Sequence, residues 1–221
     1  MYYNKVAKLS RLIHTYLASS ELLQFYDKET TFSDSFRDAL VSNNIAKALE
    51  TSQDLLSTMQ SQGTGTRTLR DLADAMYFNC RYLDSLLVYH TASQLYKTQT
   101  ETLSKKLICK GVVNCVLGVL NTMKVLLRHN ENAHVYMENY AMPFIQDILQ
   151  FVHQLEPDSC VFEYRAWLYY YLGWANLQLG KTRQHNDLLR KALEEIEMNS
   201  SNEQDYKKLE VYHLCLKSLG R

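Results

Sequence analysis

Cysteine and histidine are the residue types in this chain best suited to metal or nucleophilic chemistry, and their spacing predicts neither. Cys109 and Cys115 lack a second pair at close spacing, which is typical of small core residues rather than of a zinc site. His129 and His134 are five residues apart, which places them on diverging faces of a helix and fits no common metal spacing. A cysteine–histidine nucleophile needs partners that meet in space, and no cysteine is marked as activated. The sequence therefore predicts no enzyme activity, no cofactor and no metal site.

The glycine-rich stretch of the chain, residues 62–66, has the sequence Gln-Gly-Thr-Gly-Thr. A phosphate-binding loop requires a lysine after its glycines and a strand before them, and this stretch lacks both. We interpret it as a plain connector, and we expect no bound nucleotide.

Aromatic side chains offer a different kind of chemistry, the binding of another molecule. Among the 16 tyrosines and two tryptophans, Trp167, Tyr170, Tyr171 and Trp174 recur at spacings of three and four, so they form a stripe along one helix. Core packing is the favoured interpretation, because such rings pack well while their polar tips reach water or a backbone group. The alternative is a platform that faces a ligand.

A polar set on another segment could extend such a platform. Lys106, Lys110 and Asn114 recur every four residues, so they share one face of a helix and could continue a polar groove. The whole chain balances 24 basic against 24 acidic residues and has no basic cluster. Nucleic-acid binding, which requires a basic footprint, is therefore not expected.

The elements that must position these side chains are expected to be helices. The chain has only two prolines and seven glycines, 46% of its residues are hydrophobic, and apolar residues recur at spacings of three and four. We predict an all-α protein with about nine helices. The clearest expected helices cover residues 3–26, 36–60, 67–80, 82–97, 102–126, 131–155 and 203–219.

Local signals refine these limits. Ser33 or Asp34 is expected to cap the helix that follows, and Asp158 or Ser159 the helix that begins near residue 161. Pro143 predicts a kink or a fresh helix start, because proline lacks an amide donor and clashes with the previous turn.

Targeting and compartment signals are sparse. The most apolar run, residues 112–120, is shorter than the about 20 residues of a membrane span, so it is expected to be a buried helix. The amino terminus lacks the apolar core of a secretory signal. Five cysteines without close pairing are typical of a reducing compartment. We expect an intracellular protein, cytoplasmic or nuclear, without a membrane span.

One stretch combines small and bulky residues in the manner of a helix pair that stacks on its neighbours. It runs Tyr-Tyr-Tyr-Leu-Gly-Trp-Ala-Asn-Leu-Gln-Leu-Gly over residues 169–180 and continues to Ala192 and Leu193. It resembles a tetratricopeptide repeat, whose pattern is Trp-x-x-Leu-Gly-x-x-Tyr, then Ala-x-x-x-Phe, a later Ala and a closing Pro. Leu172, Gly173 and Ala192 match the pattern. Tyr169 replaces Trp and Leu189 replaces Phe, while the expected Tyr, Ala and Pro are replaced by Asn176, His185 and Glu197.

A second copy of the pattern lies 100 residues earlier. Leu72 and Ala92 match it, and the substitutions are Ala73 for Gly, Ser85 for Ala and Tyr89 for Phe. Three units of the 34-residue repeat would place the copies 102 residues apart, so helices between them are expected to vary in length. Residues 44–56 resemble the second helix of a still earlier unit.

The resemblance implies a single domain over residues 1–221, a right-handed α-solenoid of about four antiparallel helix pairs. Its better-matched units lie near residues 66–98 and 166–199, and a capping helix near 203–219 has Lys207, Lys208 and Glu210 facing water. A helical bundle is the alternative. Because the first helix of each repeat lines the concave face in this family, the register would expose Trp167, Tyr170, Trp174 and Gln178 in one unit and Arg67, Arg70, Asp74 and Tyr77 in the other.

The function implied by the resemblance is a non-catalytic scaffold or adaptor within a larger complex. It would bind an extended segment or helix of a partner protein in its concave groove, at the eight residues named above together with Lys106, Lys110 and Asn114. A structural segment of a larger protein and a peptide-sensing regulator are the alternatives. Some members of the family grip a terminal carboxylate with a Lys and Asn clamp, but Asp74 lies where that clamp needs a neutral donor.

Overall fold

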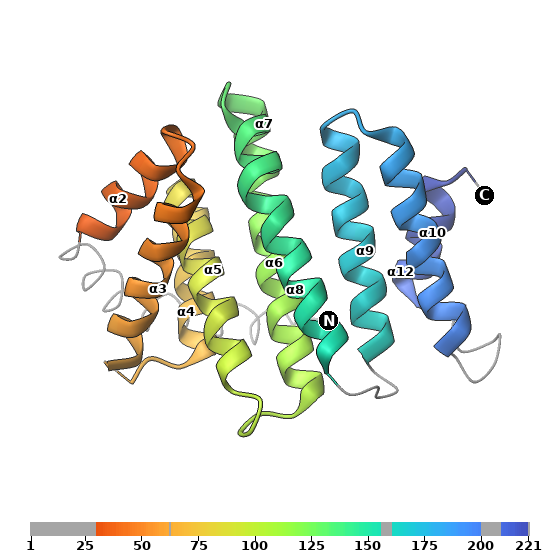
Figure 1. Cartoon of the computed structure of the whole chain (residues 1–221), viewed down its shortest axis with the longest axis horizontal. Helices are drawn as coiled ribbons and strands as arrows, with labels where there is room; N and C mark the ends of the chain where they lie inside the picture. The colour runs from red at the N-terminus through yellow and green to blue at the C-terminus, as the bar shows by residue number, and fades with distance from the viewer. Residues whose placement is uncertain (1–29, 62, 156–160, 200–208, 221) are drawn as a thin grey trace, which may run out of the picture. The chain divides into compact units, whose positions relative to one another are not determined.

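A computed structural model describes residues 30–61, 63–155, 161–199 and 209–220. All regular structure in these ranges is helical, which confirms the predicted all-α class (Figure 1). The chain divides into two compact units, Met1–Leu95 and Tyr96–Arg221, and each is described by itself. The predicted helix over residues 3–26 and the predicted caps Asp158 and Ser159 lie outside the described ranges.

The first unit holds α2 (Thr30–Val41), α3 (Ile45–Ser61), α4 (Thr66–Phe78) and most of α5 (Tyr82–Thr98). The single helix predicted over residues 36–60 is therefore wrong, because the chain turns between α2 and α3. Asn43 has φ of 54° at this turn, and asparagine adopts the left-handed conformation more readily than most residues. Ser33 does not cap a helix either, since it lies inside α2 and its hydroxyl donates to Asp84 of α5.

The turn from α4 to α5 is a Schellman turn, in which a left-handed residue closes the helix end. The amide of Cys80 donates to the carbonyl of Tyr77, the amide of Arg81 donates to that of Met76, and Cys80 has φ of 61°. The two helices are then joined by side chains: the Ser85 hydroxyl donates to the carbonyl of Ala73 at 3.0 Å.

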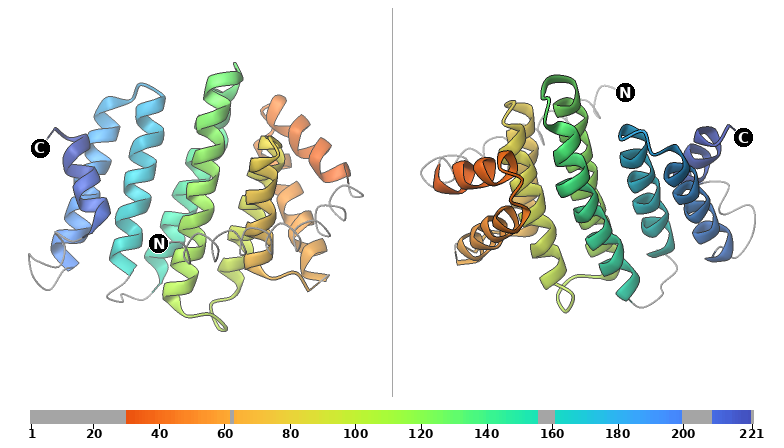
Figure 2. Two further views of the ribbon diagram at one scale, coloured as in Figure 1. Left: turned by 180° about the vertical axis from the view of Figure 1, so that it is seen from behind. Right: turned by 45° about the horizontal axis from the view of Figure 1, so that its top comes forward.

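The second unit begins with α6 (Lys105–His129), which starts where Ser104 accepts a hydrogen bond from the amide of Leu107. Next come α7 (Ala133–Tyr136), the π-helical turn η1 (Met137–Ala141) and α8 (Met142–Gln154). The unit ends with α9 (Val161–Gln178), α10 (Thr182–Asn199) and α12 (Glu210–Ser218). The view from behind in Figure 2 shows α6 and α12 on the same side of this unit, with α9 between them.

Proline 143, predicted to mark a kink or a fresh helix start, lies where the helix changes type: helical residues run without a gap from Ala133 to Gln154, and α8 begins at Met142. It occupies the first turn of α8, directly after η1, where the amide of Met142 donates to the carbonyl of Met137 five residues earlier. Because proline has no amide donor, one main-chain hydrogen bond is missing here, and the π turn lies directly before the position where the regular pattern is interrupted. A separate break at residues 130–132 corrects the placement of His129 and His134, which belong to two helices, α6 and α7, and not to one.

The apolar run at residues 112–120 is part of the 25-residue α6. This helix is long and apolar enough to cross a membrane by length and composition, with a mean hydropathy of 1.4 in its most apolar window. However, 61% of that window is buried inside the protein, among the surrounding helices. Cys109 and Cys115 lie on the same helix and are buried, as expected of small core residues.

The pair α9 and α10 repeats the construction of α4 and α5. Gly180, with φ of 72°, occupies the place of Cys80: its amide donates to the carbonyl of Leu177, and the amide of Lys181 donates to that of Asn176. His185 Nδ1 donates to the carbonyl of Gly173 at 2.9 Å, as the hydroxyl of Ser85 does to Ala73. The two hairpins therefore have the same local geometry at positions 100 residues apart.

A polar cluster joins α8, α9 and α10. Arg165 donates to Nδ1 of His153 at 3.3 Å, and Nε2 of the same ring lies 3.1 Å from the hydroxyl of Tyr169. Arg165 also forms an ion pair with Glu195 at 3.2 Å. Because a guanidinium can only donate, this geometry requires His153 to be neutral, with its proton on Nε2.

Candidate binding pocket

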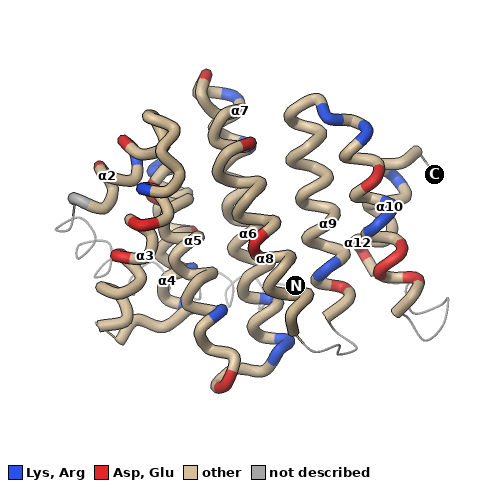
Figure 3. The backbone as a smooth tube through the Cα atoms, viewed as in Figure 1, with Lys and Arg blue, Asp and Glu red and all other residues tan. Residues whose placement is uncertain are grey.

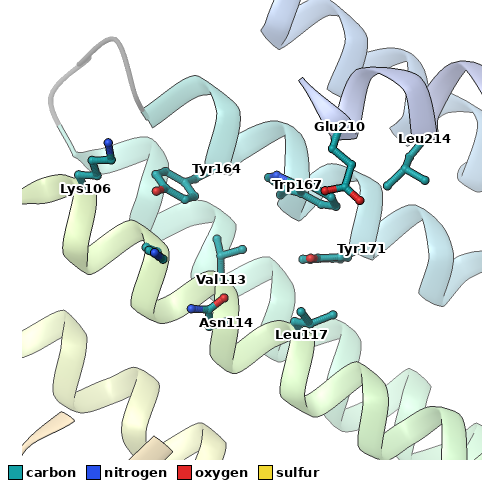
Figure 4. Close-up of a pocket in the computed structure, with 10 residues that line it drawn as sticks. Lys106, Val113, Asn114, Leu117, Tyr164, Trp167, Tyr171, Glu210 and Leu214 are labelled. Carbon is teal, nitrogen blue, oxygen red and sulfur yellow. The ribbon is translucent and has the colours of Figure 1, made fainter. Parts of the chain in front are cut away.

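A cavity of about 520 Å³ opens between α6, α9 and α12, within the unit Tyr96–Arg221 (Figure 4). Its size lies within the range of about 300 to 1,000 Å³ that is usual for ligand sites. It is lined by Lys106, Lys110, Val113, Asn114 and Leu117 of α6, Tyr164, Trp167 and Tyr171 of α9, and Glu210 and Leu214 of α12.

The α6 wall follows from the helical repeat of its sequence. Its five lining residues fall at spacings of three and four, so they share one face, on which Lys106, Lys110 and Leu117 are exposed and Val113 is buried. Away from the pocket, Gly111 lets the ring of Tyr96 pack directly against the helix. A Cβ at Gly111 would lie 2.6 Å from Cδ1 of that ring.

The α9 wall is aromatic. Trp167 and Tyr171 lie side by side, with ring centroids 5.4 Å apart and planes tilted by 33°. Trp167 is half-buried, whereas Tyr171 is buried, and burial raises the pKa of the Tyr171 hydroxyl to about 12. This hydroxyl therefore stays protonated near neutral pH and can donate a hydrogen bond.

The α12 wall is held by apolar anchors. Val211 and Cys215 are buried in one cluster with Ala166 of α9 and Leu189 of α10. Because these anchors face inward, Glu210 is left exposed at the pocket, and Figure 4 shows its carboxylate pointing toward Trp167. Burial also raises the pKa of the Cys215 thiol to about 12, so this cysteine is a packing group and a poor nucleophile.

The charged groups of the pocket form no ion pairs with the described part of the chain. None of Lys106, Lys110 and Glu210 has an ion-pair partner among the residues that the structure describes. Over the rest of this unit, Lys and Arg are interspersed with Asp and Glu along the helices (Figure 3). The pocket thus combines an apolar lining with two cations and one anion that are not neutralised by described neighbours.

The structure brings together four of the predicted site residues. Lys106, Lys110, Asn114 and Trp167 line one pocket. The remaining predicted residues of α9 do not line it. Tyr170, like Trp167, packs against the buried cluster of α9, α10 and α12, and Trp174 and Gln178 are half-buried elsewhere on the helix. The aromatic stripe is therefore divided between the core and the pocket.

The predicted residues of the first unit have partners inside the chain. Arg67 and Arg70 form ion pairs with Asp71, at 3.9 and 3.6 Å. The hydroxyl of Tyr89 donates to Asp74, and burial raises the pKa of the Asp74 carboxyl despite this hydrogen bond.

The ring of Tyr77 packs edge-on against two neighbouring rings, those of Phe78 and Tyr82. A ligand at this surface would have to compete with these internal contacts. The role of Arg67, Arg70, Asp74 and Tyr77 in binding remains a prediction.

Tyr164, Glu210 and Leu214 were not predicted as site residues, and Tyr171 was predicted only as a member of the aromatic stripe. The signal for Tyr164 and Tyr171 was present, since they lie three and four residues from Trp167 on α9. Glu210 and Leu214 carry no such signal, because their place in the pocket depends on how α12 packs. Lys207 and Lys208, predicted beside Glu210, lie outside the described residues. Within the described ranges, no group of three or more His, Cys, Asp or Glu residues could hold a metal ion.

Comparison with known proteins gives no relative for this chain: no protein-family model, no curated protein and no solved structure matches it.

Proposed function

We propose that this chain is a non-catalytic scaffold that binds a segment of a partner protein in the pocket between α6, α9 and α12. The observation that carries the proposal is the pocket itself, in which Trp167 and Tyr171 lie beside Lys106, Lys110 and Glu210. Sites that bind other molecules typically join an apolar lining to a few well-placed polar groups. Such a protein would act as an adaptor or as a subunit of a larger complex.

We further infer that the fold is a right-handed solenoid of the tetratricopeptide type. Support comes from the two hairpins with equivalent turns and equivalent hydrogen bonds, Ser85 to Ala73 and His185 to Gly173. In this reading α6, α9 and α12 are first helices of successive units, which line the concave face in the family. The pocket would then be part of a concave binding groove.

The proposal is tested by reversing the charge at Lys106 and Lys110. We expect the Lys106→Glu/Lys110→Glu variant to lose a partner that the wild-type chain captures from cell lysate. Both side chains are exposed, so the substitutions remove contacts to a partner without opening the core. The matched control is Lys124→Glu/Lys191→Glu, which makes the same charge change at exposed positions outside the pocket.

Circular dichroism first establishes that both variants are as helical as the wild type. Loss of a partner only in the pocket variant supports the proposal. If both variants capture what the wild type captures, the pocket is not the binding surface. The alternative of a purely structural segment would then be favoured.

A further inference from the structure

The positive and negative side chains of the pocket lie at different ends of it. Lys106 and Lys110 extend from the first two turns of α6, whereas Glu210 is the first residue of α12. Figure 4 shows Lys106 at one end of the labelled set and Glu210 near the other, beside Leu214, with Tyr164 and Val113 between Lys106 and Glu210. A ligand that fills the pocket therefore meets positive charge at one end and negative charge at the other.

The middle of the pocket is apolar. Val113, Leu117, Leu214 and the rings of Trp167 and Tyr171 supply most of its lining between the charged ends. Burying an aliphatic or aromatic side chain here would be favourable, because each such chain removes apolar surface from water. Asn114 lies on the same wall and offers a donor and an acceptor to a backbone amide group.

The Glu210 end has the composition of a site for a basic side chain. Its carboxylate points toward the indole of Trp167, and the ring of Tyr171 is tilted against that indole. A guanidinium or ammonium group placed there would pair with the carboxylate and lie near aromatic faces, which attract cations. The Lys106 and Lys110 end would in turn attract a carboxylate.

The length of the α6 wall limits the length of a bound segment. From Lys106 to Leu117 the α6 wall covers eleven residue steps, or about 16 Å at the rise of an α-helix. An extended chain covers that length in about five residues. The cavity of about 520 Å³ holds a few side chains rather than a whole helix.

We propose that the pocket binds a short extended peptide segment, with an acidic side chain at Lys106 and Lys110, a basic side chain between Glu210 and Trp167, and aliphatic or aromatic residues between them. This inference rests on the proposed function, because it specifies the partner segment of the same pocket.

The test uses a random twelve-residue peptide library displayed on phage and selected on the full chain. We expect the enriched peptides to carry an acidic and a basic residue a few positions apart, on opposite sides of an apolar centre. The tightest peptide is then synthesised, and its dissociation constant is measured by fluorescence anisotropy. We expect Glu210→Lys to weaken this peptide about fivefold at low salt.

Charge exchange separates a direct contact from an indirect effect. A peptide whose basic residue is changed to glutamate should bind Glu210→Lys more tightly than it binds the wild type. The control, Glu197→Lys, changes an exposed carboxylate on α10 outside the pocket and should bind both peptides as the wild type does.

The outcomes distinguish the two proposals. If the enriched peptides lack an acidic and a basic residue on opposite sides of an apolar centre, or if Glu210→Lys changes no affinity while Lys106→Glu/Lys110→Glu does, the inferred charge pattern is wrong and the proposed function stands. If no enriched peptide depends on Lys106 and Lys110, both proposals are overturned.

Discussion

At the scale of single residues, Cys80 occupies a backbone position that favours glycine. Its φ of 61° closes the end of α4, and Gly180 does the same for α9 with φ of 72°. A side chain at such an angle meets its own backbone, which costs about 1 kcal/mol. The same turn is therefore made with strain in one hairpin and without it in the other.

We predict that Cys80→Gly stabilises the protein by about 0.5 kcal/mol, because relief of this strain exceeds the added entropy of the unfolded chain. Urea unfolding measures the difference. Cys80→Ser keeps a side chain at the same φ and should leave stability unchanged, which separates the backbone effect from loss of the thiol. A Cys80→Gly variant less stable than the wild type would contradict the argument.

Gly111 is constrained by space rather than by backbone angle. We predict that Gly111→Ala destabilises the chain by about 1 to 3 kcal/mol, because its Cβ would overlap the buried ring of Tyr96. Thermal or urea unfolding provides the measurement. In a Tyr96→Ala background the ring is absent, so the same alanine should cost less. Additive effects of the two substitutions would show that the overlap is not the cause.

At the scale of helices, the contact of α8 with α9 depends on a neutral histidine. Burial lowers the pKa of His153 below its usual value of 6.5, and Arg165 lowers it further, while Glu195 opposes the shift. Protonation would place a proton on Nδ1, where the guanidinium of Arg165 already donates. Because the unfolded chain binds this proton more readily, the contribution of neutral His153 to the free energy of unfolding is fully present above pH 6.5. This contribution is lost as the pH falls below 6.5.

We therefore predict that the midpoint of thermal unfolding falls between pH 7 and pH 5 less steeply in His153→Gln than in the wild type, since glutamine does not titrate. Circular dichroism melts at several pH values test this. His134→Gln removes an exposed imidazole from α7 and serves as the control, with the slope of the wild type expected. Equal slopes in all three proteins would show that His153 does not couple stability to pH.

Helix positions were predictable where the signal lies in the local sequence. Gly180 ended α9 as expected from its freedom at positive φ, and Pro143 marked the start of α8. The break at Asn43 was missed because asparagine is also found inside helices, so only the turn itself reveals its left-handed angle. The π turn before Pro143 likewise depends on how the segment packs, and the sequence indicated only a break.

The pocket was predictable only in part, because some of its residues meet through the packing of separate helices. The helical spacing of Lys106, Lys110 and Asn114 placed them on one face, and the sequence analysis suggested that this face could continue a groove that also holds Trp167. Glu210 entered the pocket through the packing of α12, which no spacing within one helix can indicate.

The predicted site residues of the first unit illustrate a related limit. A helical register does not show that the Tyr89 hydroxyl donates to Asp74 or that Asp71 pairs with Arg70. Such internal pairing depends on the packing of two helices and on side-chain rotamers.

At the scale of the whole molecule, the two compact units should respond separately to damage in their cores. Leu55 of α3 and Ile148 of α8 are each fully buried, one in each unit. We predict that Leu55→Ala accelerates amide hydrogen exchange mainly within Met1–Leu95, and Ile148→Ala mainly within Tyr96–Arg221. Each truncation should remove about 2 to 5 kcal/mol of protection locally.

Hydrogen exchange measured by mass spectrometry at peptide resolution reports the exchange rate in each unit. Leu49→Ala is the control, because this leucine is partly exposed. Uniform acceleration across both units after either core substitution would mean that the chain unfolds as one cooperative body. The α5 helix, which crosses the boundary, should respond to both substitutions.

The π turn η1 changes the number of residues that this segment needs to complete its helical turns. The buried side chains from Ala133 to Val152 all lie on one face of the segment and recur in each of five turns. These five turns take 19 residues, whereas five turns of a regular α-helix take about 18. The segment is thus equivalent to an ordinary helix that has accepted one inserted residue, and η1 absorbs the surplus so that both ends keep the same rotational phase. A chain shorter by one residue within η1, and with alanine in place of Pro143, would keep the same side chains inward as an uninterrupted helix.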